Sequence, residues 1–267
     1  MQGEVETNGG FSGTKRQNFM LRKLYGVLRD ETELTSDDDI LEWIEETTAW
    51  DCGFDEEHEC IFASLAKALP NTSFSFEIKR SDYTMESWEH NIEYRKGCLL
   101  FTTSHYYNLH EDEDTCEWDY DWDINPLGKY EIDNEGKIAD EWLSKESTEF
   151  EKEKFAKWLR LIETGADAPA DLMILGMLYE TGLAGVEKKL TSAWACYLKA
   201  AETGDNEAIV FVDEIFSDEC KEERRQLLAG KCIGKESYPL FCDLAARKNS
   251  AELTAEILEY GRILNQL

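Results

Sequence analysis

The chain has 267 residues, of which 57 are acidic and 28 basic, so its formal net charge at pH 7 is −29. This length fits one large domain or two of ordinary size. Eight Trp, 11 Tyr and 12 Phe exclude an acidic disordered tail, a class that is poor in aromatic residues, and four Pro exclude collagen-like or proline-rich material.

Helices are predicted near the start of the chain, after a polar end. Residues 1–17 contain little apolar material and are expected to form a flexible N-terminus. Apolar residues at helical spacing predict a first helix over residues 18–29. Ser36, which precedes three aspartates, predicts the start of a second helix, because the amide-rich N-terminus of a helix favours a hydroxyl cap and negative charge. A third helix is expected over residues 56–69.

The apolar pattern then changes to strict alternation, which is typical of strands with one buried face. The predicted strands are residues 74–78, 88–94, 98–107, 129–132 and 137–139. Residues 18–144 are therefore expected to form an acidic α+β domain, in which helices pack on one face of an antiparallel sheet. The segments Ala68-Leu69-Pro70 and Phe74-Ser75-Phe76, followed by further strands, resemble small ferredoxin-like domains of bacterial proteins. No activity follows from that resemblance.

From residue 145 to residue 267 the patterns are helical only, which predicts an all-α domain. This part of the chain resembles itself, because a shift of 39 residues places Glu163-Thr164-Gly165 on Glu202-Thr203-Gly204. A period of about 40 residues that contains helix, turn and helix is typical of an α-solenoid, in which stacked helical hairpins complete each other's core.

One stretch, residues 170–208, places small residues and tyrosines at set offsets. These residues are Leu175, Gly176, Tyr179, Gly182, Gly185, Val186, Ala193, Tyr197, Ala200, Ala201, Gly204 and Ala208. The stretch resembles a Sel1-like repeat, a relative of the tetratricopeptide repeat, with partial repeats on either side. Gly176 and Ala193 would let two helices approach closely, while Tyr179 and Tyr197 would fill the gap between the layers. The resemblance implies an adaptor that binds other proteins on a concave face, without catalysis.

Residues 111–123, called here the acidic-aromatic segment, hold eight carboxylates, three aromatic rings and no basic residue. Rings and carboxylates together hold Arg and Lys side chains, so the segment predicts a binding surface for a basic protein. The predicted partner-binding residues are Glu111, Asp112, Glu113, Asp114, Glu117, Trp118, Asp119, Tyr120, Asp121, Trp122 and Asp123. The alternative is an exposed acidic loop whose tryptophans anchor it to the sheet.

Metal binding and catalysis find little support in the sequence. The acidic-aromatic segment resembles the start of a calcium loop, but Ile124 and Tyr130 stand where that loop needs Gly and Glu. Cys52, His58 and Cys60 do not follow a common zinc spacing. No nucleophile motif or phosphate-binding loop is recognised, so we expect no metal, no cofactor and no catalytic residue.

The sequence also bears on the compartment. No apolar run approaches the roughly 20 residues of a membrane helix, and the start of the chain lacks the apolar core of a signal peptide. None of the eight cysteines forms Cys-x-x-Cys. We therefore expect a cytoplasmic protein with reduced thiols. The negative charge would repel nucleic acids and anionic membranes, so neither is an expected direct partner.

The best-supported function is a noncatalytic interaction protein that presents an acidic surface to a basic protein partner. Two alternatives remain open. The first is an immunity or inhibitor protein that neutralises a toxin or a nucleic-acid-processing enzyme by imitating a phosphate backbone, an idea supported by the fourteen acidic and no basic residues of 30–59. The second is a hydrolase whose site carries no recognisable motif. The oligomeric state is not predicted.

Overall fold

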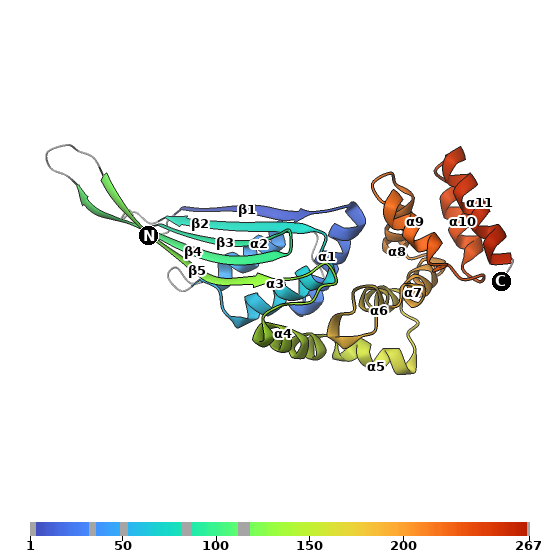
Figure 1. The fold of residues 1–267 in the computed structure, drawn as a ribbon, viewed down its shortest axis with the longest axis horizontal. Helices are drawn as coiled ribbons and strands as arrows, with labels where there is room; N and C mark the ends of the chain where they lie inside the picture. The colour runs from blue at the N-terminus through green and yellow to red at the C-terminus, as the bar shows by residue number, and fades with distance from the viewer. Residues whose placement is uncertain (1–3, 32–35, 49–52, 82–86, 112–117, 266–267) are drawn as a thin grey trace. The chain divides into compact units, whose positions relative to one another are not determined.

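A computed structural model of the chain describes residues 4–31, 36–48, 53–81, 87–111 and 118–265, without the side chains of residues 106–127. Two compact units make up the fold (Figure 1). The sheet unit comprises residues 1–13 and 28–150, and the helical unit comprises residues 14–27 and 151–267. The chain therefore passes from the sheet unit into the helical unit and back before it completes the sheet.

Five antiparallel strands form the sheet, in the order in which they occur in the chain. The strands are β1 (Glu4–Ser12), β2 (Ser73–Ser81), β3 (Ser87–Arg95), β4 (Cys98–Glu111) and β5 (Trp118–Glu131). This sheet confirms the α+β class. The ferredoxin-like arrangement is wrong, because its split β-α-β units place another strand between the two strands that each helix connects, whereas each strand here pairs with its neighbour in the chain.

The flexible N-terminus expected for residues 1–17 is wrong for residues 4–12, which form β1. The strand pairs with β2 along its whole length. Its Phe11 is buried, with the ring centroid 5.8 Å from that of Phe74 and 5.4 Å from that of Phe76. Backbone hydrogen bonds and one buried ring are enough to hold a mostly polar strand at the edge of a sheet, and such a strand carries little apolar signal in the sequence.

Two helices, α2 (Asp38–Thr47) and α3 (Glu56–Ala68), cover one face of the sheet (Figure 1). Buried and more exposed residues alternate along β2. The ring of Phe62 on α3 lies 5.7 Å from the rings of both Phe74 and Phe76, so the core of this unit is aromatic. The second and third predicted helices and the first three predicted strands are confirmed, but the predicted cap at Ser36 is wrong: Asp37 is the N-cap of α2, and its side chain makes no capping hydrogen bond.

The region of β5 corrects the expectation of a loop followed by a short hairpin. Residues Trp118–Asp123 of the acidic-aromatic segment lie in β5. The strand pair predicted at 129–132 and 137–139 is reduced to the end of β5 and an isolated bridge between Ile132 and Ile138. The composition of this region resembles that of a loop, but its alternation of aromatic and acidic residues has the period of a strand.

Every described element from residue 141 onward is helical, which confirms the predicted all-α part. Its elements are α4 (Glu141–Lys154), α5 (Ala156–Thr164), α6 (Pro169–Thr181), η1 (Leu183–Gly185), α7 (Leu190–Glu202), α8 (Asn206–Asp213), η2 (Glu214–Phe216), α9 (Lys221–Ala229), α10 (Tyr238–Ala246) and α11 (Ala251–Asn265). None of the helices in the described ranges is both long enough and apolar enough to cross a bilayer.

The helix α1 (Lys15–Leu28) packs in the helical unit, although the predicted boundaries, 18–144 and 145–267, place it with the sheet. The ring centroid of Phe19 on α1 lies 5.2 Å from that of Phe211 on α8. The apolar spacing in the sequence indicates that one face of α1 is buried. It does not indicate which elements pack against that face. That choice depends on shape and charge complementarity with residues far along the chain.

The pairing of α6 with α7 confirms the close approach predicted at Gly176. This glycine is buried, and a Cβ atom added to it would overlap the ring of Tyr197. Ala193 and Tyr197 of α7 are fully buried. A similar pair joins α10 and α11, where a Cβ atom at Gly261 would overlap Tyr238. Small residues therefore let two successive helices of the helical unit approach closely.

Candidate functional site

The negative charge of the protein is concentrated in the sheet unit. This unit has 36 acidic and 9 basic residues, a net charge of −27, whereas the helical unit has 21 acidic and 19 basic residues, a net charge of −2. Lys15, Arg16, Arg22 and Lys23 of α1 contribute to the near-neutrality of the helical unit. A field strong enough to attract a basic partner is therefore a property of the sheet unit.

The β4–β5 hairpin extends beyond the rest of the sheet (Figure 1). The pairing of β3 with β4 ends at Ser87 and Tyr106. The strands β4 and β5 continue to pair past this point, over residues 107–111 and 118–121. We call residues 105–111 and 118–123, which comprise this extension and the two residue pairs next to it, the acidic ribbon.

Backbone alternation sorts the residues of β5 by chemical type. The register positions of one face are occupied by Trp118, Tyr120 and Trp122, and those of the other face by Asp119, Asp121 and Asp123. Successive residues of a strand belong to opposite faces, so this order produces one aromatic row and one carboxylate row. The register shift near Asn108 and His110 lies on the β4 side and leaves the alternation of β5 continuous.

The structure describes only some of the predicted partner-binding residues. Those outside the described residues are Asp112, Glu113, Asp114 and Glu117. The other seven are Glu111 on β4 and the consecutive residues Trp118–Asp123 on β5. Glu111 is the register partner of Trp118, so the first residue of the acidic-aromatic segment lies on the strand next to its last six residues.

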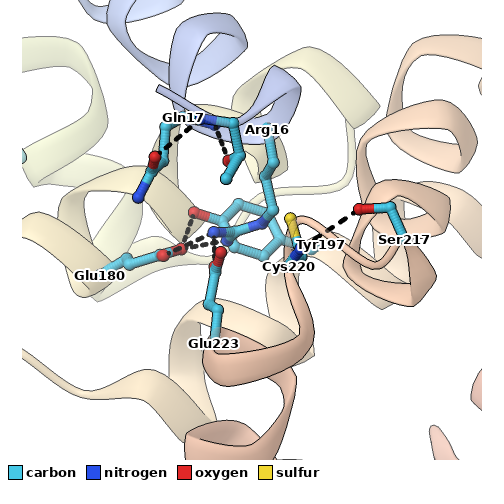
Figure 2. A network of polar contacts seen from close by, with 8 residues as sticks. Arg16, Gln17, Glu180, Tyr197, Ser217, Cys220 and Glu223 are labelled. Carbon is cyan, nitrogen blue, oxygen red and sulfur yellow. Dashed lines mark hydrogen bonds and ion pairs between the residues drawn. The ribbon is translucent and has the colours of Figure 1, made fainter. Parts of the chain in front are cut away.

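A second polar cluster, which the sequence analysis does not predict, surrounds Arg16 of α1 in the helical unit. Its guanidinium donates to both carboxylate oxygens of Glu180 on α6, at 2.9 and 2.6 Å, and to Glu223 on α9. The hydroxyl of Tyr197 on α7 donates to the same Glu180 at 2.8 Å. Figure 2 shows these side chains converging on the guanidinium. Through its own hydrogen bonds, one arginine thus links α1 to two other helices of the unit, α6 and α9.

Aromatic rings enclose the same arginine, whose side chain is only 1% exposed. Its Cζ atom lies 4.6 Å from the ring centroid of Phe211, 5.2 Å from that of Trp194 and 5.7 Å from that of Tyr197. Burial by itself lowers the pKa of Arg16, but its carboxylate partners outweigh burial and raise the pKa above its ordinary value. The cluster therefore holds a permanent positive charge in the core, where it can act as a structural clamp.

Among the described residues, Asp55, His58 and Thr47 have contacts that resemble a catalytic triad. Nδ1 of His58 lies 2.7 Å from Oδ1 of Asp55, and Nε2 lies 2.8 Å from Oγ1 of Thr47. However, the imidazole is 1% exposed, and the Thr47 hydroxyl donates to the carbonyl of Trp43 at 2.8 Å. Asp55 also accepts from the backbone amide of His58 and completes a capping box at the N-terminus of α3. The geometry suits a helix cap better than a nucleophile.

We predict that His58 makes the protein less stable as the pH falls. Burial lowers the pKa of His58, an effect that Arg29 reinforces and the carboxylates of Asp55 and Glu57 oppose. Because the folded-state pKa lies below the unfolded value of about 6.5, stability is fully present above pH 6.5 and is lost as the pH falls toward the folded-state value. Urea denaturation between about pH 7.5 and pH 5 should show this loss, and His58→Gln should show less of it.

A proton NMR titration measures the same pKa directly, with His58→Gln used to assign the resonance. Gln is a suitable replacement because its amide can still bond to Asp55 or Thr47. A measured pKa at or above the ordinary histidine value contradicts the prediction. Equal slopes of stability against pH in the wild type and the variant also contradict it.

Metal-ligating residues do not gather within the described parts of the chain. No group of three or more His, Cys, Asp or Glu side chains is arranged there to hold a metal ion. Of the residues considered for zinc, Cys52 lies outside the described residues, and Cys60 is buried on α3. The imidazole of His58 is held by Asp55 and Thr47, as described above.

Known proteins add no family assignment to this geometry. Comparison of the chain with protein-family models, with curated protein sequences and with solved structures finds no match.

Proposed function

We propose that the protein is a noncatalytic interaction protein whose sheet unit binds a basic protein partner. The observation that carries the proposal is the acidic ribbon, where a carboxylate row and an aromatic row occupy opposite faces of one projecting hairpin. Carboxylates pair with Lys and Arg, and aromatic faces stack on guanidinium groups, so both faces suit a basic polypeptide. The net charge of −27 on this unit adds long-range attraction.

We propose further that the helical unit is a Sel1-like array. The close approach of Gly176 to Tyr197 and of Gly261 to Tyr238 supports this identity, because small residues recur where successive helices pack. Its net charge of −2 makes this unit a weaker attractor for basic partners than the sheet unit. In this proposal the array is a scaffold, the acidic ribbon selects the partner, and both act in the cytoplasm, where the cysteines stay reduced.

The ribbon is tested by a fluorescently labelled Arg/Lys-rich peptide, whose binding to the full chain is measured by anisotropy at low and high salt. The variant Asp119→Asn/Asp121→Asn/Asp123→Asn removes the carboxylate row. We expect it to weaken binding about five- to tenfold at low salt, since an exposed charge pair contributes about 0.2–1 kcal/mol. Salt should reduce this difference, because it screens exposed charges.

A matched control removes three carboxylates from the helical unit instead. The variant Glu187→Gln/Glu202→Gln/Glu219→Gln changes exposed residues and alters the net charge by the same amount. It should bind the peptide within about twofold of the wild type. Equal weakening by both triple variants would show that total charge, and not the ribbon, attracts the peptide. Absence of binding at low salt would contradict the proposal as a whole.

A second candidate is an inhibitor that imitates a phosphate backbone, and the concentration of charge in the sheet unit favours it. According to this candidate function, the partner is a toxin or a nucleic-acid-processing enzyme. The protein would inhibit it by placing the sheet unit in its basic groove, as an immunity protein does. A double-stranded DNA oligonucleotide should then compete with the protein for such an enzyme. Failure of the DNA to compete would contradict the imitation of a phosphate backbone, but not the proposal that the protein binds a basic partner.

A further inference from the structure

A cavity of about 290 Å³ lies in the helical unit, where η2 and the starts of α9 and α11 meet. Its lining residues are Phe216, Ser217, Asp218, Lys221, Arg224, Lys248, Ser250, Glu252 and Leu253. Three of these residues are cationic, two are acidic (Asp218 and Glu252) and two carry hydroxyl groups, so the lining has a net charge of +1. The cavity therefore gathers hydrogen-bond donors and a small excess of positive charge within a protein that is acidic as a whole.

The lining residue Arg224 is 4% exposed and only partly satisfied. Its Nη1 donates to the carbonyls of Ile215 at 2.8 Å and Ser217 at 3.1 Å, and its Nε donates to Glu256 at 3.1 Å. Its Nη2 makes no hydrogen bond with any other residue that the structure describes. This nitrogen is not among the fully buried polar atoms that lack a partner, so solvent reaches it, and an acceptor placed in the cavity could form a charge-assisted hydrogen bond with the guanidinium.

The two lysines of the cavity have partners that another anion could replace. Lys221 pairs with Glu252 at 2.7 Å, and Lys248 pairs with Asp213 at 2.5 Å. The side chain of Glu252 is 77% exposed. Exposed ion pairs of this kind contribute little stability, so exchanging a carboxylate partner for a more highly charged anion requires little energy.

Two helix N-termini add to the positive potential. The 9-residue α9 starts at Lys221 and the 15-residue α11 starts at Ala251, and residues from both first turns line the cavity. Ser250 precedes α11, and its Oγ accepts from the amide of Leu253 at 3.3 Å. Backbone amides and the helix dipole favour an anion at such positions.

The charge of the whole protein does not prevent anion binding at this place. The helical unit has a net charge of only −2, and most of the negative charge belongs to the sheet unit. Exposed charges separated by more than about 8 Å are largely screened at physiological ionic strength. Binding is therefore governed by the groups that line the cavity.

We propose that this cavity binds a phosphate group. A phosphate carries about −1.5 to −2 charge and three or more acceptor oxygens, so it offers several acceptors to the donors that line the cavity, Arg224 and the two lysines. A single carboxylate has too little charge to replace both Glu252 and Asp213. The group belongs either to inorganic phosphate or to a phosphorylated side chain of another protein, and the two share the chemistry that the cavity recognises.

Binding to the full chain is measured by isothermal titration calorimetry at constant ionic strength. The probes are inorganic phosphate, a phosphoserine peptide and the same peptide without phosphate. Binding of the phosphopeptide at least tenfold tighter than inorganic phosphate assigns the site to a phosphorylated protein. Equal or tighter binding of inorganic phosphate assigns it to the free ion, and both results support the proposal.

Variants with opposite expected effects identify the cavity as the site. Lys221→Gln and Lys248→Gln should each weaken binding about fivefold or more, because each removes a cationic donor. Glu252→Gln should strengthen binding about threefold or more, because it releases Lys221 and removes a competing carboxylate. Lys199→Gln is the matched control, since Lys199 is also exposed and paired, with Asp167 at 3.0 Å, on a different helix. It should bind like the wild type.

Two results would overturn the proposal. The first is affinity weaker than about 10 mM for both phosphate-containing probes. The second is a variant that behaves against expectation: Glu252→Gln weakens binding, or Lys199→Gln weakens binding as much as Lys221→Gln does. Because these substitutions alter exposed side chains, circular dichroism should show that all the variants keep the fold.

Discussion

Replacing Arg16 with methionine is expected to lower the free energy of unfolding by about 3–5 kcal/mol, a large share of the stability of an ordinary domain. Methionine fills a similar space among the rings of Trp194 and Phe211, but it leaves the partly buried carboxylates of Glu180 and Glu223 without their cation. Burial already raises the pKa of Glu223, against the effect of Arg16, so the carboxylate is sensitive to the loss of this partner.

The loss is measured by urea denaturation of the full chain, followed by tryptophan fluorescence. A triple variant, Arg16→Met/Glu180→Gln/Glu223→Gln, removes the unpaired charges and should recover most of the stability, because a neutral core replaces a broken ion pair. Arg16→Lys keeps the charge and loses the two-point contact with Glu180, so it should lie between the wild type and Arg16→Met. A loss below about 1 kcal/mol in Arg16→Met would show that the clamp is not structural.

Replacing Gly176 with alanine is expected to lower the free energy of unfolding by about 1–3 kcal/mol, the usual cost of overpacking a core. The added methyl group would overlap the ring of Tyr197, which cannot move easily because its hydroxyl bonds to Glu180 at 2.8 Å. Alanine has a higher helix propensity than glycine by about 1 kcal/mol, so a measured loss understates the steric effect.

The matched control for this substitution is Gly234→Ala, where a Cβ atom would meet nothing within 4 Å. It should leave stability within about 0.5 kcal/mol of the wild type. Both variants are compared by urea and thermal denaturation. If Gly176→Ala is as stable as the wild type, the close approach of α6 and α7 does not contribute to the stability of the helical unit.

Local patterns in the sequence were sufficient for most elements of this fold. Alternation in Phe74-Ser75-Phe76 predicted a strand of the sheet, and the small residue Gly176 predicted a tight helix pair, because each depends on neighbours within a few residues or one repeat. The polar strand β1 and the strand at Trp118–Asp123 were missed. In both cases polar composition concealed a strand that backbone pairing stabilises.

The candidate sites also differ in how far the sequence alone predicts them. The acidic-aromatic segment stands out in composition, so its residues could be proposed from the sequence, although their separation onto two faces needed the register of β5. Arg16 was visible only as one member of a basic cluster near the N-terminus. Its partners Glu180 and Glu223 lie far along the chain, and no local pattern connects them.

By itself, the sequence determined the mixed class of the fold, the helical character of the second half, and the acidic character of the surface. These properties are sums over residues or short periodic patterns, which need no knowledge of distant contacts. Only the tertiary structure decided that α1 packs in the helical unit and that the excess charge belongs almost entirely to the sheet unit. It also brought the cavity around Arg224 together. The physical reason is that packing and electrostatic energies depend on distances in space, which the order of residues along the chain does not specify.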